Sequence, residues 1–255
     1  MPIAPVDHPL DLATQSLLTW GSWGLTLVLL AWAIKLGREE NTHFYLLLVL
    51  AVLCGALVEP IYDMAMMLYF YATEGVWSHF SAFGIPQPVW THSGYAILYA
   101  APAVYVSRRI GQGRLDARGL YLCALVECQM STAFEVFGVN GLNDGAYTYW
   151  GPHVFRIAHY PFAIAVLETA QITLFATTAA MLRARVNGGL GLGALFVLFP
   201  VCFIGANLGA GGPMIIALHQ AEPSVALVTL GTLASMGAAL VVIRLAAGLL
   251  PLGKL

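Results

Sequence analysis

Long runs of apolar residues alternate along the chain with short polar segments. Backbone groups in lipid must be satisfied within the segment, so runs of this length form helices. A bilayer core about 30 Å thick needs about 20 helical residues, which each run meets or approaches. The pattern predicts an all-α integral membrane protein, a seven-transmembrane-helix bundle that forms one domain over residues 1–255. The seven predicted spans cover residues 12–36, 43–71, 89–110, 120–137, 160–182, 190–210 and 225–250.

Composition supports this class. Of the 255 residues, 59% are hydrophobic and 9% are charged, whereas soluble domains carry about 25% charged residues. The net charge of -2, without a dense basic stretch, argues against a nucleic-acid partner. The first eight residues lack the positive segment of a cleavable signal, so we expect the first span to direct its own insertion. The predicted partners are the lipid bilayer and a lipophilic small molecule, while oligomeric state is left open.

Basic residues indicate the orientation. Cytoplasmic loops are enriched in Lys and Arg. Only Arg156 falls on the opposite side of the membrane from the other ten basic residues, if the N-terminus lies outside and the C-terminus inside. We therefore predict this orientation, in the cell membrane. The ten are Lys35, Arg38, Arg108, Arg109, Arg114, Arg118, Arg183, Arg185, Arg244 and Lys254.

Acidic residues inside the apolar runs mark the candidate site, because an ionisable side chain at membrane depth is costly and suggests function. Glu59 and Asp63 lie four residues apart and share a helix face, and Pro60 between them can kink the helix. At about 1.5 Å of rise per residue, four of the five acids reach a similar depth in the outer half. A structural, hydrogen-bonded role is the alternative, above all for Glu127. The five are Glu59, Asp63, Glu127, Glu135 and Glu168.

Aromatic and polar side chains near the outer ends of the spans can surround these acids. Several lie in or beside two longer loops, 72–88 and 138–159. Aromatic residues there form either an interfacial belt or a lid over the outer mouth of the bundle, and the tyrosines can also be packing residues. The predicted substrate-binding residues are Tyr62, Trp90, His92, Tyr95, Tyr99, Tyr147, Tyr149, Trp150 and Asn207.

Buried carboxyls in such a setting suit acid chemistry. Burial and like charge favour the protonated form of a carboxyl, which then acts as a general acid while a neighbouring carboxylate acts as the base. Aromatic rings stabilise a cationic intermediate. The two lysines lie at the end of the first span, Lys35, and beyond the last span, Lys254, and no HExxH spacing occurs, so we expect no cofactor and no metal. A divalent ion held by the carboxylates is the alternative.

A set of polar and aromatic segments occurs in a fixed order along the chain: residues 58–63, residues 83–90 with Tyr95, Glu135, residues 145–152 and residues 160–162. These segments resemble the AveC-type spirocyclase family of actinobacterial membrane proteins, over roughly residues 50 to 215. That resemblance implies an acid-catalysed cyclase and dehydratase of polyketide maturation, which forms a spiroketal from a dihydroxy-ketone. The sequence departs from the family where residues 162–165 replace a Trp-rich stretch and where Glu168 replaces a neutral residue.

Membrane-bound terpene cyclases of meroterpenoid pathways are similar in outline. They are also small seven-helix proteins with buried carboxylates, and they protonate an epoxide or an alkene. Our leading hypothesis is a cofactor-free membrane cyclase acting on a lipophilic polyketide or isoprenoid, with a terpene cyclase as its nearest alternative. A proton-coupled transporter or a ligand sensor without enzymatic activity is the alternative from another class. The predicted catalytic residues are Glu59, Asp63, Glu135 and Glu168.

Overall fold

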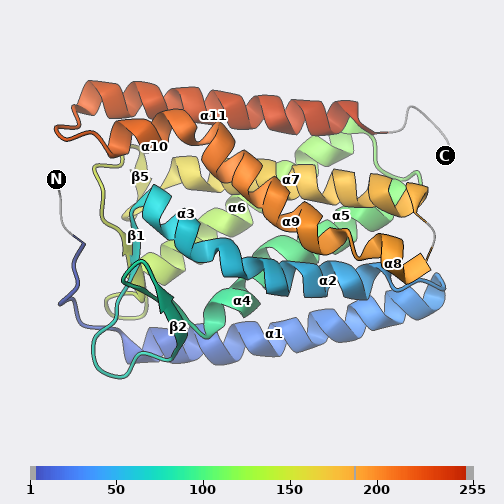
Figure 1. Ribbon diagram of the computed structural model, residues 1–255, viewed down its shortest axis with the longest axis horizontal. Helices are drawn as coiled ribbons and strands as arrows, with labels where there is room; N and C mark the ends of the chain where they lie inside the picture. Colours follow the sequence, from blue (N-terminus) through green and yellow to red (C-terminus); the bar gives the residue numbers. More distant parts are fainter. Residues whose placement is uncertain (1–3, 187, 251–255) are drawn as a thin grey trace.

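Long helices, roughly aligned with one another, dominate the structure, a computed structural model that describes residues 4–186 and 188–250 (Figure 1). Apolar side chains such as Leu27 and Leu230, 64% and 66% exposed, face outwards from these helices. Together with the length of the helices, this makes the chain a multi-pass membrane protein. Six helices in the described part are long and apolar enough to cross a membrane: Leu12–Glu39, Phe44–Met66, Ala117–Asn140, Phe162–Arg185, Gly188–Ala210 and Val225–Gly248.

The helical elements follow one another with few interruptions. They are α1 (Leu12–Glu39), α2 (Phe44–Gly55), η1 (Ala56–Val58), α3 (Glu59–Met66), α4 (Trp90–Tyr95), η2 (Ala96–Ala100), α5 (Ala101–Gly111), α6 (Ala117–Asn140), α7 (Phe162–Arg185), α8 (Gly188–Leu192), α9 (Leu195–Ile204), η3 (Gly205–Ala210), α10 (Gly212–Leu218) and α11 (Val225–Gly248). η1 is a 3₁₀ turn, whereas η2 and η3 are wider π turns.

Short strands lie in the connections between helices, at the end of the bundle that we call the strand-bearing end (left in Figure 1). They form three antiparallel pairs, β1 with β4, β2 with β3 and β5 with β6. The all-α prediction therefore holds for the bundle and is wrong for these connections. The strands are β1 (Leu68–Phe70), β2 (Ser78–Ala82), β3 (Ile85–Pro88), β4 (Tyr147–Tyr149), β5 (Arg156–Ile157) and β6 (Tyr160–Pro161).

The centre of the bundle is α7. Of its most apolar segment, 83% is buried, against 33% for those of α1, α6 and α11. It contacts α5, α6, α9 and α11, while α1 and α11 run along opposite edges of the view in Figure 1. Polar groups on α7 are therefore deep inside the protein, and Glu168 is among them.

Two predicted spans end differently from expectation. The run 43–71 is helical only to Met66, because Met67 adopts a left-handed backbone with φ of 53°. The chain then continues as β1, in which Leu68 pairs with Tyr149 of β4. In the run 160–182 the helix starts at Phe162, since Pro161 has an extended backbone and precedes the helix as its cap.

The helix is interrupted beside the acid pair, where the sequence predicts a kink. The 3₁₀ turn η1 separates α2 from α3 directly before Glu59, and Pro60 occupies the first turn of α3. Proline is tolerated there because that N–H has no partner within the helix in any case. The predicted span 89–110 is helical over residues 90–111, through α4, η2 and α5, but is not among the six helices above.

At the opposite end of the bundle one carboxylate joins four helices. Glu40, directly after α1, accepts hydrogen bonds from Arg108 of α5 at 2.8 Å, Arg183 of α7 at 2.8 Å and the Tyr45 hydroxyl of α2 at 2.6 Å. Burial disfavours ionisation of Glu40, but these hydrogen bonds outweigh it and lower the pKa of Glu40 to about 2. We call these four residues the Glu40 cluster.

The Glu40 cluster predicts a pH-dependent stability. Replacement Glu40→Gln should lower the free energy of unfolding at pH 7 by about 1–3 kcal/mol, the range for hydrogen bonds to charged groups. Because folding lowers this pKa from 4.5 to about 2, the contribution is complete above pH 4.5 and is lost as the pH falls towards 2. Thermal unfolding in detergent measures both effects. The more exposed Glu39→Gln variant is the control, and an equal loss there would contradict the assignment.

Candidate functional site

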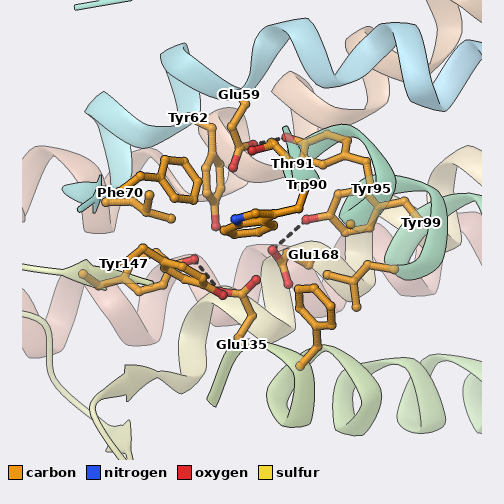
Figure 2. A pocket seen from close by; sticks show the side chains of 15 residues that line it. Glu59, Tyr62, Phe70, Trp90, Thr91, Tyr95, Tyr99, Glu135, Tyr147 and Glu168 are labelled. Carbon is orange, nitrogen blue, oxygen red and sulfur yellow. Dashed lines mark hydrogen bonds between the residues drawn. The ribbon is translucent and has the colours of Figure 1, made fainter. Parts of the chain in front are cut away.

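At the strand-bearing end the helices enclose a cavity lined by acidic and aromatic side chains (Figure 2). Three glutamates reach it from α3, α6 and α7, and five tyrosines surround them. The wall contains no Lys, Arg or His side chain. The lining residues are Glu59, Tyr62, Leu68, Phe70, Trp90, Thr91, Gly94, Tyr95, Leu98, Tyr99, Phe134, Glu135, Tyr147, Tyr149 and Glu168.

Glu168 of α7 is held on both carboxyl oxygens. Its Oε1 accepts a hydrogen bond from the Tyr99 hydroxyl at 2.8 Å, and its Oε2 accepts one from the Ser131 hydroxyl. The carboxyl is 1% exposed. Both partners are neutral, so they fix the orientation of the carboxyl without adding a positive charge.

Each of the other two glutamates also has a tyrosine partner. The Tyr95 hydroxyl donates to Glu59, and the Tyr149 hydroxyl donates to Glu135 at 2.9 Å. Figure 2 shows the carboxyls of Glu59, Glu135 and Glu168 turned towards one common space. Three acids from three helices therefore converge, as their predicted depth suggested.

Local sequence spacing explains how two helices supply these groups. Ser131 and Glu135 are four residues apart on α6 and so occupy one face, as do Tyr95 and Tyr99 along α4 and η2. Phe203 of α9 packs behind the tyrosine pair, with its ring centroid 5.4 Å from that of Tyr95. The aromatic packing holds the hydroxyls towards the carboxyls.

The fourth predicted acid lies behind the wall. Asp63 is fully buried and accepts a hydrogen bond at 2.6 Å from the side-chain amide of Gln87 on β3. It shares a face of α3 with Glu59, as expected, but sits one turn closer to the strands. Its contact ties α3 to the β2–β3 hairpin, which makes Asp63 a positioning residue in this arrangement.

The loop 138–159 covers the cavity, whereas the loop 72–88 supplies none of its lining residues. β4 brings Tyr147 and Tyr149 into the wall, and the Phe70 ring packs against Tyr147 and Trp90, with centroids 5.4 Å apart in both pairs. Of the two arrangements open from sequence, the structure thus shows a lid for the second loop.

Arg156 stabilises the conformation of this loop, to which it belongs. Its guanidinium donates to the backbone oxygens of Tyr149 at 2.7 Å, Gly151 at 2.8 Å and His159 at 2.5 Å. His153 lies beside it, and burial with the Arg156 charge lowers the pKa of His153 to about 3. This histidine is therefore neutral at physiological pH, and its contact with the Met66 carbonyl at 2.9 Å makes Nε2 the protonated nitrogen.

Three predicted substrate-binding residues lie outside the wall. His92 contacts the Leu53 carbonyl at 2.6 Å and the His79 ring nitrogen at 2.9 Å. The cavity faces Thr91, Tyr95 and Leu98 of the same helical stretch, so His92 points to a neighbouring face. The expectation that His92 shares one face with Tyr95 and Tyr99 is therefore wrong for the cavity, which the two tyrosines line and His92 does not.

Asn207 and Trp150 are the other two. The Asn207 side-chain amide donates to the Phe203 carbonyl one turn earlier at 3.1 Å, so it serves the π turn η3. Trp150 is half-buried next to β4, and its backbone N–H donates to the Met67 carbonyl at 2.9 Å. Neither lines the cavity.

Sequence reasoning missed part of the wall. Ser131 could have been found, because it falls midway between Glu127 and Glu135 at four-residue spacing on α6. Leu68 and Phe70 could not, since they reach the cavity through a pairing with β4 about eighty residues further along the chain. The missed residues of the wall and its support are Leu68, Phe70, Thr91, Gly94, Leu98, Phe134, Ser131 and Gln87.

Three hydroxyls in the wall have no partner. The side-chain oxygens of Tyr62, Thr91 and Tyr147 are buried without a hydrogen bond to any described residue, an arrangement that calls for an explanation in a native structure. The cavity measures about 30 Å³, room for about one water molecule and well below the 300–1,000 Å³ of typical ligand pockets. A chain-like ligand therefore does not fit the cavity at this size.

Within residues 4–186 and 188–250 no three His, Cys, Asp or Glu side chains are grouped as a metal site. The glutamates of the cavity are instead directed to tyrosine and serine hydroxyls. No protein-family model, curated protein or solved structure matches this chain. The geometry of the cavity is therefore the basis on which function is argued.

Close packing behind the lid gives a testable prediction. A Cβ added to Gly138 of α6 would overlap the Tyr147 ring. Replacement Gly138→Ala should therefore displace Tyr147 and lower the free energy of unfolding by about 1–3 kcal/mol, as overpacking does. Thermal unfolding compares it with Gly24→Ala in α1, where the added Cβ meets open space. Equal stability of the two variants would contradict the packing described here.

Proposed function

We propose that the protein is an integral-membrane cyclase that uses carboxyl groups, without a cofactor, for general acid and base catalysis on a lipophilic polyketide or isoprenoid. One observation carries this proposal. Three carboxyls from three helices, each oriented by a hydroxyl, surround one aromatic cavity that contains no basic side chain. Such a set can supply an acid and a base within one dry space.

In this mechanism one glutamate donates a proton to a carbonyl, a hemiketal hydroxyl, an epoxide or an alkene. The cation that results faces the rings of the tyrosines and Trp90, which stabilise it. A second glutamate takes the proton released on ring closure, so no net proton is consumed. The free hydroxyls of Tyr62 and Tyr147 are suited to orient a substrate oxygen.

Resemblance to the AveC-type family favours spiroketal formation with loss of water. The segments that carry this resemblance contribute Glu59, Tyr62, Trp90, Tyr147 and Tyr149 to the wall. A terpene cyclase that protonates an epoxide or an alkene would use the same groups. Glu168 departs from the family pattern and accepts two hydrogen bonds in the cavity. We therefore expect Glu168 to make the substrate of this protein differ from the substrates of that family.

Substrate enters only after the cavity widens. A chain-like lipophile needs more than 30 Å³, and β4 is a wall segment that belongs to the loop 138–159 and not to a helix of the bundle. Outward movement of Tyr147 and Tyr149 with β4 would enlarge the cavity for a substrate. The pairing of β4 with β1 and the contact of the Trp150 N–H with the Met67 carbonyl set the cost of that movement.

The small size of the cavity favours a second candidate function, a proton-coupled transporter or sensor. A water-sized space between carboxyls is suited to relay protons across a membrane. The alternative predicts a pH-driven proton flux into liposomes that contain the purified protein, whereas the cyclase predicts none. All three glutamates lie at one end of the bundle, which favours chemistry on one side over a path through the protein.

We further propose that the helical stretch 90–111 crosses the membrane as a seventh span, so that the chain is one seven-helix domain. The two ends of this stretch lie at opposite ends of the bundle. It begins directly after β3 at the strand-bearing end, and Arg108 near its last residue belongs to the Glu40 cluster at the other end. Positive-inside bias then places the N-terminus and strand-bearing end outside and the C-terminus inside, in the cell membrane.

Cysteine labelling tests this topology. In a chain with the four native cysteines replaced by alanine, a variant with cysteine at the exposed Glu74 before this stretch, Glu74→Cys, should react with an impermeant maleimide added to intact cells. An Arg114→Cys variant should react only after the membrane is opened. The reverse pattern would overturn the orientation, and reaction of both variants in intact cells would overturn the seventh span.

Replacement of the acids tests the catalytic proposal. Glu59→Gln keeps the shape of the side chain but removes its acidity, and should lower turnover by about 10²–10⁴-fold. Comparative metabolite analysis of cells with the native chain and with this variant should show a precursor that accumulates. That precursor should differ from the missing product by one ring closure, with or without loss of water.

The exposed Glu222→Gln variant is the matched control and should leave the metabolite profile unchanged. Tyr95→Phe removes only the partner of Glu59 and should reduce product less than Glu59→Gln does. A native metabolite profile in folded, correctly inserted Glu59→Gln protein would overturn the proposal.

A further inference from the structure

A second and larger space lies on the outside of the bundle, between α5, α6 and α7. We call it the lateral groove. It measures about 490 Å³, within the range of small-molecule pockets. Its walls are apolar side chains, among them the exposed Tyr105, Leu122 and Met130. These belong to faces of α5 and α6 that are exposed to the bilayer, so the lateral groove opens to lipid.

One carboxyl interrupts this apolar surface. Glu127 of α6 lines the lateral groove, is 3% exposed, and its Oε1 is buried without a hydrogen-bond partner among the described residues. A polar group left unpaired in an apolar setting destabilises the folded protein. Acyl chains of the bilayer carry no group that could form a hydrogen bond with the Glu127 carboxyl. A ligand with a single hydroxyl or carbonyl could form this hydrogen bond.

The lateral groove is also connected to the cavity through the sequence of α6. Glu127, Ser131 and Glu135 recur every four residues and therefore follow one face, about 6 Å apart along the axis. Ser131 donates to Glu168 of the cavity. On α7 the groove is lined by Ile172 and Thr173, about one turn beyond Glu168. A polar face thus leads from the groove towards the catalytic carboxyls.

From these observations we infer that the lateral groove binds a linear isoprenoid or polyketide chain with one hydroxyl or carbonyl near Glu127, and that substrate reaches the cavity from the bilayer. The identity of the ligand as substrate rests on the proposed function, whereas the binding site itself does not. Glu127 is a binding residue here: it hydrogen-bonds the oxygen of the chain, while the apolar walls enclose its hydrocarbon.

Photolabelling tests this inference. The full-length protein in lipid nanodiscs is labelled with a diazirine derivative of farnesol, and the modified residues are located by mass spectrometry. Labels should fall within residues 101–106 and 120–130, and unlabelled farnesol should compete for them. Farnesane, the hydrocarbon with the same skeleton, should compete about threefold to tenfold more weakly, as expected for the loss of one hydrogen bond.

Two variants define the contacts. Glu127→Leu should remove the difference between farnesol and farnesane, while Ala101→Phe should reduce labelling of both segments about tenfold by filling the lateral groove. Leu240→Phe on the exposed face of α11 is the matched control and should label as the native chain does. Equal competition by farnesane in the native protein, or labelling unaffected by Ala101→Phe, would overturn the inference.

The test separates this site from the proposed reaction. Glu59→Gln changes the cavity and not the lateral groove, so its labelling should equal that of the native chain. If groove labelling holds while Glu59→Gln leaves metabolites unchanged, the cyclase proposal fails and the binding site stands. If the metabolites change but no groove-dependent labelling occurs, the binding site fails and the reaction stands.

Discussion

Hydrogen bonds between glutamate and tyrosine are the interaction on which the strand-bearing end of this protein depends. A carboxyl inside an apolar bundle is costly unless it is hydrogen-bonded. Here the partners come from other elements: Tyr95 of α4 for Glu59 of α3, and Tyr149 of β4 for Glu135 of α6. The same contacts that satisfy the acids therefore join helices and lid, so the polar site and the fold around it form together.

Local sequence pattern was enough to predict six long apolar helices and the convergence of three of the four predicted acids. Apolar run length identifies helices because lipid leaves the backbone no other partner, and residue count along each span gave the depth of Glu59, Glu135 and Glu168. The rotation of each helix relative to its neighbours is not contained in the local pattern. His92 was expected on one face with two tyrosines of the site although it contacts the Leu53 carbonyl, and Asp63 was predicted to be catalytic although it lies behind the wall.

Pairing between distant segments was beyond local pattern. Leu68 pairs with Tyr149, and nothing near either residue specifies that partner. The left-handed Met67 that ends α3 is explained by this pairing and not by helix propensity, since an apolar run continues past it. Those parts of the site that depend on β1 and β4 thus needed three-dimensional information, as did the recognition that one long loop covers the cavity and the other does not.

The Glu40 cluster has a mechanical consequence for the whole bundle. One carboxylate ties α1, α2, α5 and α7 together at the end away from the site, through two arginines and a tyrosine. Helices that are held together at one end separate more easily at the other end. A small rotation at the restrained end produces a larger displacement at the strand-bearing end. The Glu40 cluster thus makes its own end of the bundle the rigid one and leaves the strand-bearing end, with the cavity, the more deformable one.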